Sequence, residues 1–351
     1  MGSTPLVSVV TPFYNTRDFL AECIESVLCQ TYTNWEYTLV DNCSTDGSSE
    51  IANDYANRFP DRIRVIRTDS FLSQVQNYNF ALSRISPESK YCKMVQADDW
   101  IFPDCLRSMV EVGEAYPNVG IVSAYELEGD HASLGGLPYP TREVSGREVC
   151  RLYFLKYTLL FGTPTSLLMR SDLVRSRNPF YEERHAPFED FHVCFDALLT
   201  WNFAFVHQVL TYSRRDNESM LSRIRPYQFE FFSRFSTIVT HGRKYLSEDE
   251  YQPISRRAER RYFVFLANSA LEGKDPEFWK FHRQRLASIN YSLDLAFISK
   301  WILVVLLDYI GNPKSTLELL WPRRHRIFAD IRRFLGTMYR TFIQKRPFEK
   351  V

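Results

Sequence analysis

Short apolar runs alternate with amphipathic stretches from Leu6 to about Glu126. The runs are rich in β-branched residues and read LVSVVTP, YTLVDN, IRVIRT, YCKMVQADD and VGIVSAYE. Helical patterns begin between them, near Thr16, Ser48, Ser73 and Pro103. This alternation is typical of βαβ units, so we expect an α/β domain with a mainly parallel central sheet flanked by helices.

The chain after Glu126 is less regular. Residues 129–147 are rich in Gly, Pro and polar residues and predict a loop. GTPTSLLMRSDLV predicts a strand or short hairpin, and its first part, GTPTS at residues 162–166, is a Gly-Thr-Pro turn of a kind common in loops. In EDFHVCFDALLTW, apolar residues recur at helical spacing, which places Glu189 and Asp190 at a helix N-terminus.

The C-terminal third predicts helices. Residues 226–290 have helical character, and an apolar run of about ten residues, WILVVLLDYIG, starts at Trp301. This run is too short to span a bilayer, which requires about 20 apolar residues, and Lys300 and Asp294 interrupt any longer span. We therefore expect two parts, a domain over residues 1–222 and a helical region over residues 223–351.

Length, charge and cysteine usage refine this division. The 351 residues suffice for one large domain and an appendage. The net charge of +1 combines a basic tail of +7, residues 313–351, with −6 over the rest. Seven cysteines without a CxxC pair fit a reducing cytosol, and no basic leader precedes the first predicted strand, so we expect a cytoplasmic protein. The acidic body and the absence of any known nucleic-acid module argue against nucleic-acid binding.

Polar residues follow three of the predicted strands. TPFYN and VDNCSTDGS stand at strand ends, where open α/β sheets bind ligands, although these residue types also suit ordinary turns. QADDW, from Gln96 to Trp100, places two carboxylates side by side at a third strand end. Such a pair is tolerated when a divalent cation or a ribose compensates it, and the alternative is a solvated surface pair.

These segments, in this order, resemble the family 2 glycosyltransferases of the GT-A fold. The resemblance covers residues 5 to about 126 well and extends to about residue 220. It implies a Rossmann-like GT-A domain with a C-terminal helical extension that binds a nucleoside-diphosphate-sugar. The residues implied to bind the nucleotide-sugar are Thr11, Pro12, Tyr14, Asp41, Asn77, Asp98, Arg214 and Arg215.

The resemblance also implies a metal site and a catalytic base. Mn²⁺ or Mg²⁺ would be held by Asp99 and Asp98, with Asp99 as the main ligand. The Glu-Asp pair of PFEDFHVCF would supply the base, Asp190 first and Glu189 second. Capping of the helix N-terminus by the same two carboxylates is the alternative.

Two positions depart from the family pattern. Many relatives have an aspartate where Gln96 stands, so the metal site has one carboxylate fewer. Many also have an Arg-Asn pair where this chain has Gln76-Asn77, so a cationic contact to the nucleotide is lost. Asn77 could bind the donor or could be a surface amide. Arg214 and Arg215 stand where relatives often have a basic residue and a histidine over the diphosphate.

The resulting hypothesis is an inverting transferase acting in polysaccharide or cell-surface glycan synthesis on a saccharide or lipid-linked acceptor. A nucleotidyltransferase would need a glycine-rich phosphate loop, which TPFYNTRDF lacks. A catalytically inactive assembly protein with the same fold is the other alternative, favoured by Gln96 and Gln76. The basic tail and the Trp301 run predict docking on the inner face of a membrane, and packing as a helical subdomain is the alternative.

Overall fold

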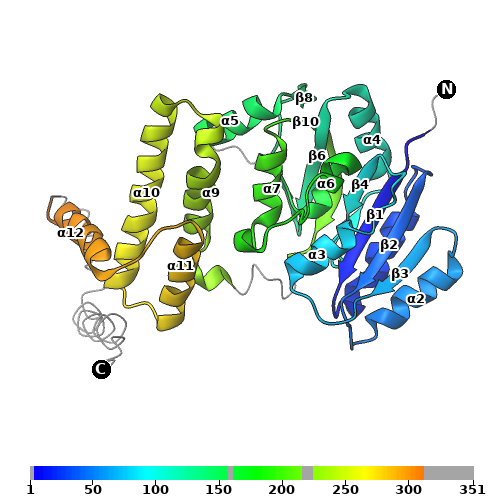
Figure 1. Ribbon diagram of the computed structural model, residues 1–351, viewed down its shortest axis with the longest axis horizontal. Helices are drawn as coiled ribbons and strands as arrows, with labels where there is room; N and C mark the ends of the chain where they lie inside the picture. Colours follow the sequence, from blue (N-terminus) through cyan, green and yellow to red (C-terminus); the bar gives the residue numbers. More distant parts are fainter. Residues whose placement is uncertain (1–3, 134, 157–160, 216–223, 312–351) are drawn as a thin grey trace. The chain divides into compact units, whose positions relative to one another are not determined.

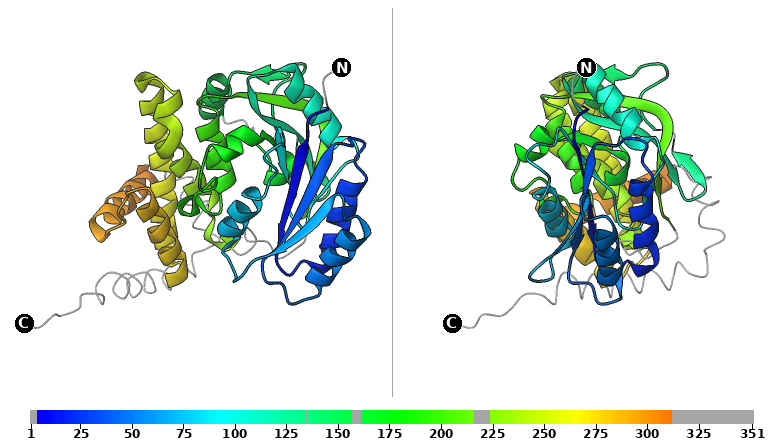
Figure 2. Two further views of the ribbon diagram at one scale, coloured as in Figure 1. Left: turned by 45° about the vertical axis from the view of Figure 1, so that its right-hand side comes forward. Right: turned by 90° about the vertical axis from the view of Figure 1, so that its right-hand side faces the viewer.

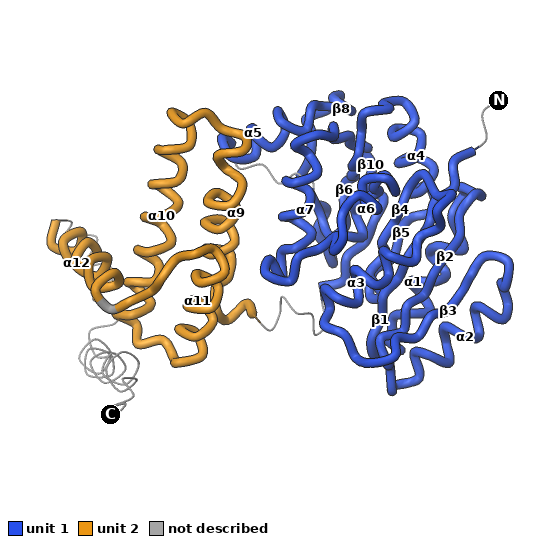
Figure 3. The backbone as a smooth tube through the Cα atoms, in the orientation of Figure 1, with its two compact units in different colours: residues 1–219 blue, residues 220–351 orange. Residues whose placement is uncertain are grey.

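The computed structural model describes residues 4–133, 135–156, 161–215 and 224–311, apart from the side chain of Leu295. The chain divides into two compact units, residues 1–219 and 220–351 (Figure 3), and each is considered by itself. The predicted domain boundary after residue 222 lies in residues 216–223, outside the described residues. The basic tail, residues 313–351, also lies outside them.

In the described part of the first unit, ten strands form one mixed sheet (Figure 1). The strands are β1 (Val7–Phe13), β2 (Trp35–Asp41), β3 (Ile63–Arg67), β4 (Tyr91–Met94), β5 (Trp100–Ile101), β6 (Val119–Glu128), β7 (His131–Ser133), β8 (Glu143–Val144), β9 (Leu168–Arg170) and β10 (Asn202–Ser213). Their order is β3-β2-β1-β4-β9-β6-β10-β5, with β7 beside β6 and β8 beside β10.

The predicted parallel core of the sheet is confirmed. β1 runs parallel to both β2 and β4, β2 runs parallel to β3, and β6 runs parallel to β10. Every residue of β1 is buried, including the polar Ser8 and Thr11, so its sequence does not show the apolar-polar alternation of a half-exposed strand. The parallel strands bring their C-terminal ends, where the polar motifs stand, to one edge of the sheet.

Helices cover both faces of this sheet (Figure 2). They are α1 (Arg17–Leu28), α2 (Ser48–Arg58), α3 (Gln74–Leu82), α4 (Cys105–Ala115), α5 (Gly146–Lys156), α6 (Ser171–Arg175) and α7 (Glu189–Ala197), with short 3₁₀ turns η1 (Pro164–Ser166) and η2 (Glu183–His185). α1, α2 and α4 share one core with the strands, while α3 and α7 lie on the opposite face. Helix α1 turns Leu20, Cys23, Ile24 and Val27, which follow helical spacing, into that core.

Two segments differ from expectation. The predicted loop over residues 129–147 contains the short strands β7 and β8 and the start of α5. In GTPTSLLMRSDLV the predicted strand is confirmed as β9, flanked by η1 and α6, and β9 is inserted antiparallel between β4 and β6 instead of forming a hairpin. A three-residue strand is stabilised by its two neighbours, and this pairing is not visible in its local sequence.

The described part of the second unit is helical. It comprises η3 (Arg225–Tyr227), α9 (Glu230–Tyr245), α10 (Glu248–Leu271), α11 (Pro276–Ser288) and α12 (Leu295–Gly311). Its core is aromatic: Phe235 and Tyr262 stack at 5.2 Å between ring centroids, and the Tyr262 hydroxyl lies 2.9 Å from His282 Nδ1. The apolar run at Trp301 lies in α12, and no helix of the described chain is long and apolar enough to cross a membrane.

Candidate active site

The turns after β1 and β2 are joined by hydrogen bonds. Asn15 N donates to Ser44 Oγ at 3.1 Å, Thr45 N donates to Asn15 Oδ1 at 2.9 Å, and Arg17 N donates to Asp46 Oδ2 at 3.0 Å. Asn15 has a positive φ of 51°, a conformation that Asn tolerates better than most residues. The polar residues that suit any turn thus fix two neighbouring strand ends to each other.

Asp41 is buried at the end of β2, between three donors. Ser44 N donates to its Oδ1 at 2.8 Å, and Arg67 Nη1 and the Ser49 hydroxyl donate to its Oδ2. Arg67 ends β3 and stands opposite Asp41 in the parallel register. Sequence analysis missed this ion pair, although two strands that both end in a charged residue could have suggested it.

The predicted nucleotide residues of β1 differ in exposure. The Thr11 hydroxyl is buried, donates to the Val95 carbonyl at 2.8 Å and lies 2.8 Å from the Tyr37 hydroxyl. Pro12 is buried as well, whereas Tyr14 is 43% exposed and packs edge-on against Phe71, 62% exposed, with 4.8 Å between ring centroids. Phe71 was not predicted. Two aromatic rings therefore stand at the surface beside the joined turns.

The segment that carries Phe71 is fastened to the end of β2. Asn42 Nδ2 donates to the Leu72 carbonyl at 3.0 Å, and Leu72 N donates to Asn42 Oδ1 at 2.8 Å. Because Asn42 is buried, this pair of bonds holds Phe71 in a fixed place beside Tyr14.

The two aspartates of QADDW have different surroundings. Asp99 is buried and accepts hydrogen bonds from the Thr165 hydroxyl at 2.6 Å, the Ser213 hydroxyl at 3.1 Å and Arg214 N at 3.0 Å. Burial, and then the charge of Asp98, raise the pKa of Asp99 to about 7. Asp98 is partly exposed, so its carboxylate is the one of the pair that a ligand can reach.

The two glutamines that depart from the family pattern have roles in local structure. Gln96 Nε2 donates to the Tyr78 hydroxyl at 2.9 Å. Gln76 closes a capping box at the start of α3, where Ser73 N donates to Gln76 Oε1 at 3.1 Å and Gln76 N donates to Ser73 Oγ at 3.2 Å. Next to it, Asn77 is buried, and its Oδ1 has no hydrogen-bond partner among the described residues. A buried acceptor of this kind calls for a donor.

Glu189 and Asp190 form the first turn of α7, as predicted from helical spacing. Phe188 stands at the N-cap position of this helix, and its side chain makes no capping hydrogen bond. Asp190 Oδ1 accepts from Phe191 N at 2.8 Å. Burial, and then the charge of Glu189, raise the pKa of Asp190 to about 7.

These carboxylates lie within electrostatic range of one another. Both Glu189 and Asp98 raise the pKa of the buried Tyr78 hydroxyl, although burial is the main cause. Glu126, at the end of the VGIVSAYE run, contributes to the raised pKa of Asp99 and of Asp190. The structure thus gathers acidic groups from β4, β6 and α7.

Glu126 was not predicted as part of the site. It is buried, accepts from the Thr163 hydroxyl at 2.6 Å, and shares the single proton of the Ser213 hydroxyl, 2.5 Å away, with Asp99. The GTPTS segment therefore supplies hydroxyls to two carboxylates, Thr163 to Glu126 and Thr165 to Asp99. The buried Lys93 ammonium holds the Thr165 carbonyl at 2.5 Å, and burial lowers the pKa of this lysine.

The two arginines after β10 take different positions. Arg214 Nε donates to the Asp98 carbonyl at 3.1 Å, and its guanidinium lies 4.6 Å from the Phe19 ring centroid and pairs with Glu22. Arg215 instead pairs with Glu128 at the end of β6. Arg214 is therefore in contact with the acidic group, and Arg215 contacts the neighbouring strand.

Few protein side chains are available as metal ligands in this region. Among the described residues, no group of three or more His, Cys, Asp and Glu side chains could hold a metal ion. Mg²⁺ or Mn²⁺ bound to a diphosphate needs only one or two protein carboxylates, since phosphate oxygens and water supply the other ligands. Asp98 and Asp99 fit an ion shared with a substrate, and they do not form a protein-only metal cage.

Comparison with known proteins places these motifs in a family. Residues 8–177 match the family described as Glycosyl transferase family 2. EpsE of Bacillus subtilis (strain 168), named as a glycosyltransferase, is 34% identical over 156 residues, 43% of this chain and 55% of EpsE. TuaG of the same organism, named for teichuronic acid biosynthesis, is 36% identical over 107 residues, 30% of this chain and 41% of TuaG. The chain thus spans about half the length of these curated relatives.

Solved structures agree on the fold. S. aureus TarS 1-349 in complex with UDP-GlcNAc has a TM-score of 0.58 at 17% identity, with 80% of this chain and 79% of that chain covered. The mannosyltransferase PcManGT from Pyrobaculum calidifontis, in complex with GDP-Man and Mn²⁺, has a TM-score of 0.51 at 17% identity, with 97% and 88% covered. At this identity the likeness concerns the fold.

Proposed function

Because the chain belongs to glycosyl transferase family 2, we propose that it transfers a sugar, with inversion, from a nucleoside-diphosphate-sugar to a saccharide or lipid-linked acceptor. The observation that carries this proposal is the position of Asp190, a carboxylate of raised pKa in the same acidic group as Asp98 and Asp99. The names of EpsE and TuaG support a role in cell-surface polysaccharide synthesis.

The donor nucleotide would lie on the joined turns after β1 and β2. Tyr14 and Phe71 offer aromatic faces for the base, and the ion pair with Arg67 holds Asp41 in place beneath it. Thr11 and Pro12 would contribute through the backbone, since the Thr11 hydroxyl is used inside the core. Asn77 Oδ1 would accept a hydrogen bond from the donor, which would satisfy this buried oxygen.

The diphosphate would meet an acidic group that repels it unless a cation accompanies it. Mn²⁺ or Mg²⁺, when bound, would neutralise the leaving diphosphate. We assign Asp98 as its principal protein ligand, in place of Asp99, because Asp99 is buried and already accepts three hydrogen bonds. Arg214, hydrogen-bonded to the Asp98 carbonyl, would add positive charge next to the diphosphate. Arg215, paired with Glu128, would bind at the edge of the nucleotide-sugar site.

Asp190 would act as the general base. The acceptor hydroxyl gives its proton to the Asp190 carboxylate while its oxygen bonds to the anomeric carbon. On the opposite side, the bond to the phosphate oxygen breaks, and the nucleoside diphosphate leaves with the electron pair. The raised pKa makes Asp190 a stronger base than an ordinary aspartate, and Glu189 maintains that pKa through its charge.

A donor panel tests this function. UDP-, GDP- and dTDP-sugars with Mn²⁺ should include at least one donor from which the protein releases nucleoside diphosphate. Asp190→Asn should lower turnover about 10²- to 10⁴-fold and leave donor binding nearly unchanged. Release from no donor would instead support the inactive assembly protein, which the engagement of Gln96 with Tyr78 favours.

We further propose that the protein acts at the inner face of a membrane. Helix α12 exposes four large apolar side chains at helical spacing, namely Leu303, Leu306, Leu307 and Ile310. Such a stripe beside a basic segment is typical of helices that lie in the membrane interface. The basic tail that follows has a net charge of +7.

A further inference from the structure

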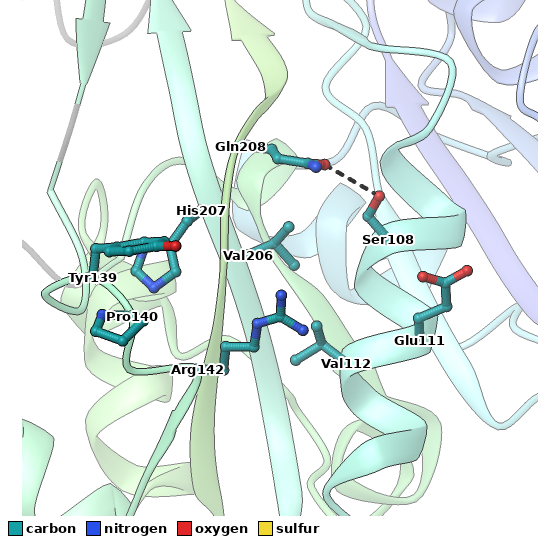
Figure 4. A pocket seen from close by; sticks show the side chains of 9 residues that line it. All are labelled: Ser108, Glu111, Val112, Tyr139, Pro140, Arg142, Val206, His207 and Gln208. Carbon is teal, nitrogen blue, oxygen red and sulfur yellow. Dashed lines mark hydrogen bonds between the residues drawn. The ribbon is translucent and has the colours of Figure 1, made fainter.

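A groove on the first unit is lined by residues outside the acidic group (Figure 4). It has a volume of about 240 Å³ and lies between α4, the segment that precedes β8, and the middle of β10. Gln208, which lines the groove, stands five residues before Ser213 on β10, and Ser213 contacts Asp99 of the candidate active site. Roughly 17 Å of extended strand therefore separates the groove from Asp99.

The edge of β10 is open at this groove. β8 pairs with β10 at Phe203 and Ala204, and β5 pairs with it at Thr211 and Tyr212. On the other side, the register with β6 shifts between Val206 and Val209. His207 and Gln208 therefore form a bulge, a feature that redirects side chains and often occurs beside binding sites.

The bulge holds an aromatic ring at the surface. His207 Nε2 lies 2.8 Å from the Thr141 carbonyl, so Nε2 donates; in the neutral imidazole, Nδ1 then accepts from the Tyr125 hydroxyl at 3.1 Å. Tyr139 packs edge-on against this fixed imidazole at 5.4 Å and is 81% exposed. One face of an oriented aromatic ring is thus available to a ligand.

Polar groups with unused hydrogen-bonding capacity surround the ring. Arg142 on one side and Glu111 on the other are exposed, and neither side chain has an ion-pair or hydrogen-bond partner in the described parts of the chain. Gln208 Oε1 accepts a long hydrogen bond of 3.4 Å from the Ser108 hydroxyl. Val112 and Val206 add apolar surface to the lining of the groove.

This combination matches a neutral sugar ring. Each hydroxyl of a sugar both donates and accepts, so it can satisfy Arg142 and Glu111 together, and the planar guanidinium and carboxylate suit adjacent hydroxyls. The less polar face of the ring can pack on Tyr139. A phosphate is disfavoured because Glu111 offsets the one arginine.

We propose that this groove binds a saccharide unit of the acceptor chain, apart from the transfer site. The inference rests on the proposed function for the identity of the ligand, and it deepens that function. A long acceptor held in the groove stays near Asp190 at a raised effective concentration, whereas a short acceptor gains nothing.

The test is a binding measurement without donor. Saturation-transfer NMR with maltohexaose, chitohexaose and β-1,4-mannohexaose should show binding of at least one of them to the full-length protein. Tyr139→Ala and Arg142→Ala should each weaken that binding about tenfold or more. Arg107→Ala, an exposed arginine on α4 outside the groove, should not weaken it.

Asp190→Asn separates this inference from the proposed transfer activity. This variant should bind the same oligosaccharide as the unmodified protein, because the groove lies apart from the base. Absence of binding by all three oligosaccharides, or binding that survives both Tyr139→Ala and Arg142→Ala, would overturn the inference. If no sugar donor releases nucleoside diphosphate, the proposed transfer activity is contradicted, but the oligosaccharide binding measurement still tests the groove. The two proposals can therefore be overturned independently.

Discussion

At the scale of single residues, burial decides what each carboxylate can do. Asp41 is buried beside Arg67 and keeps a counter-charge, whereas Asp99 and Asp190 are surrounded by other acids. The pKa of both is raised to about 7 from an ordinary value of 3.8. Proton uptake at these two residues therefore falls in the range where an enzyme works, which makes their roles accessible to pH measurements.

We expect kcat/KM to rise with pH through about 7, because only the deprotonated Asp190 can accept the acceptor proton. The measurement is donor turnover from pH 5 to 9 at saturating Mn²⁺. In Asp190→Asn, the residual activity should lose this rise. A rise of the same size in the variant would assign the titration to another group.

The same shift predicts the pH dependence of stability. Between about pH 4 and 7, the folded protein retains protons on Asp99 and Asp190 that the unfolded chain has released, so the free energy of unfolding falls as pH rises. Asp190→Asn removes one of these groups. The Tm advantage of the variant over the unmodified protein should therefore be larger at pH 8 than at pH 5. A constant difference across this range would contradict a raised pKa at Asp190.

Metal dependence distinguishes the two aspartates of QADDW. Asp98→Asn should raise the Mn²⁺ concentration needed for half-maximal donor turnover at least tenfold, because it removes the reachable ligand. Asp99→Asn should raise it less, since Asp99 mainly holds Thr165, Ser213 and Arg214 in place. The opposite order of effects would restore Asp99 as the main ligand, as the family resemblance implied.

At the scale of elements, α12 combines two surfaces. Ile298, Ile302 and Val305 are buried within the second unit, whereas the stripe of Leu303, Leu306, Leu307 and Ile310 is exposed. Helix α12 therefore provides core packing on one side and an unpaired apolar stripe on the other. This division accommodates both interpretations of the apolar run, as part of a helical subdomain and as a membrane-docking surface.

We expect the double substitution Leu303→Ser with Leu307→Ser to reduce binding to vesicles of phosphatidylglycerol and phosphatidylcholine about tenfold or more. Each substitution removes the favourable free energy of burying a leucine in the membrane interface, which is about 1.5 to 3 kcal/mol for a fully buried side chain. Vesicle flotation measures the change. Leu155→Ser is the control, because Leu155 is similarly exposed, at 41%, on α5 of the first unit. An equal loss in both variants would remove α12 from the docking surface.

At the scale of the whole molecule, the sequence predicted local features better than pairings. The starts of α1, α2, α3 and α4 were found within two residues, because caps and helical spacing are local signals. The place of β9 and the partners of Asp41, Asp99 and Gln96 were missed. Each of these contacts joins residues far apart in sequence, and no local pattern specifies which strand becomes a neighbour.

The uneven charge of the molecule yields a last prediction. The tail, residues 313–351, has a charge of +7 and the rest has −6, so attraction to an anionic bilayer must come from the tail. Raising NaCl from 0.05 to 0.5 M should weaken vesicle binding of the full chain strongly, because salt screens exposed charges. A chain ending at Gly311 should bind weakly and with little salt dependence, whereas the α12 double variant should bind weakly but keep its salt dependence. If the shortened chain retained the full salt dependence, the attraction would have to come from basic residues of the folded units, and the tail would have no part in docking.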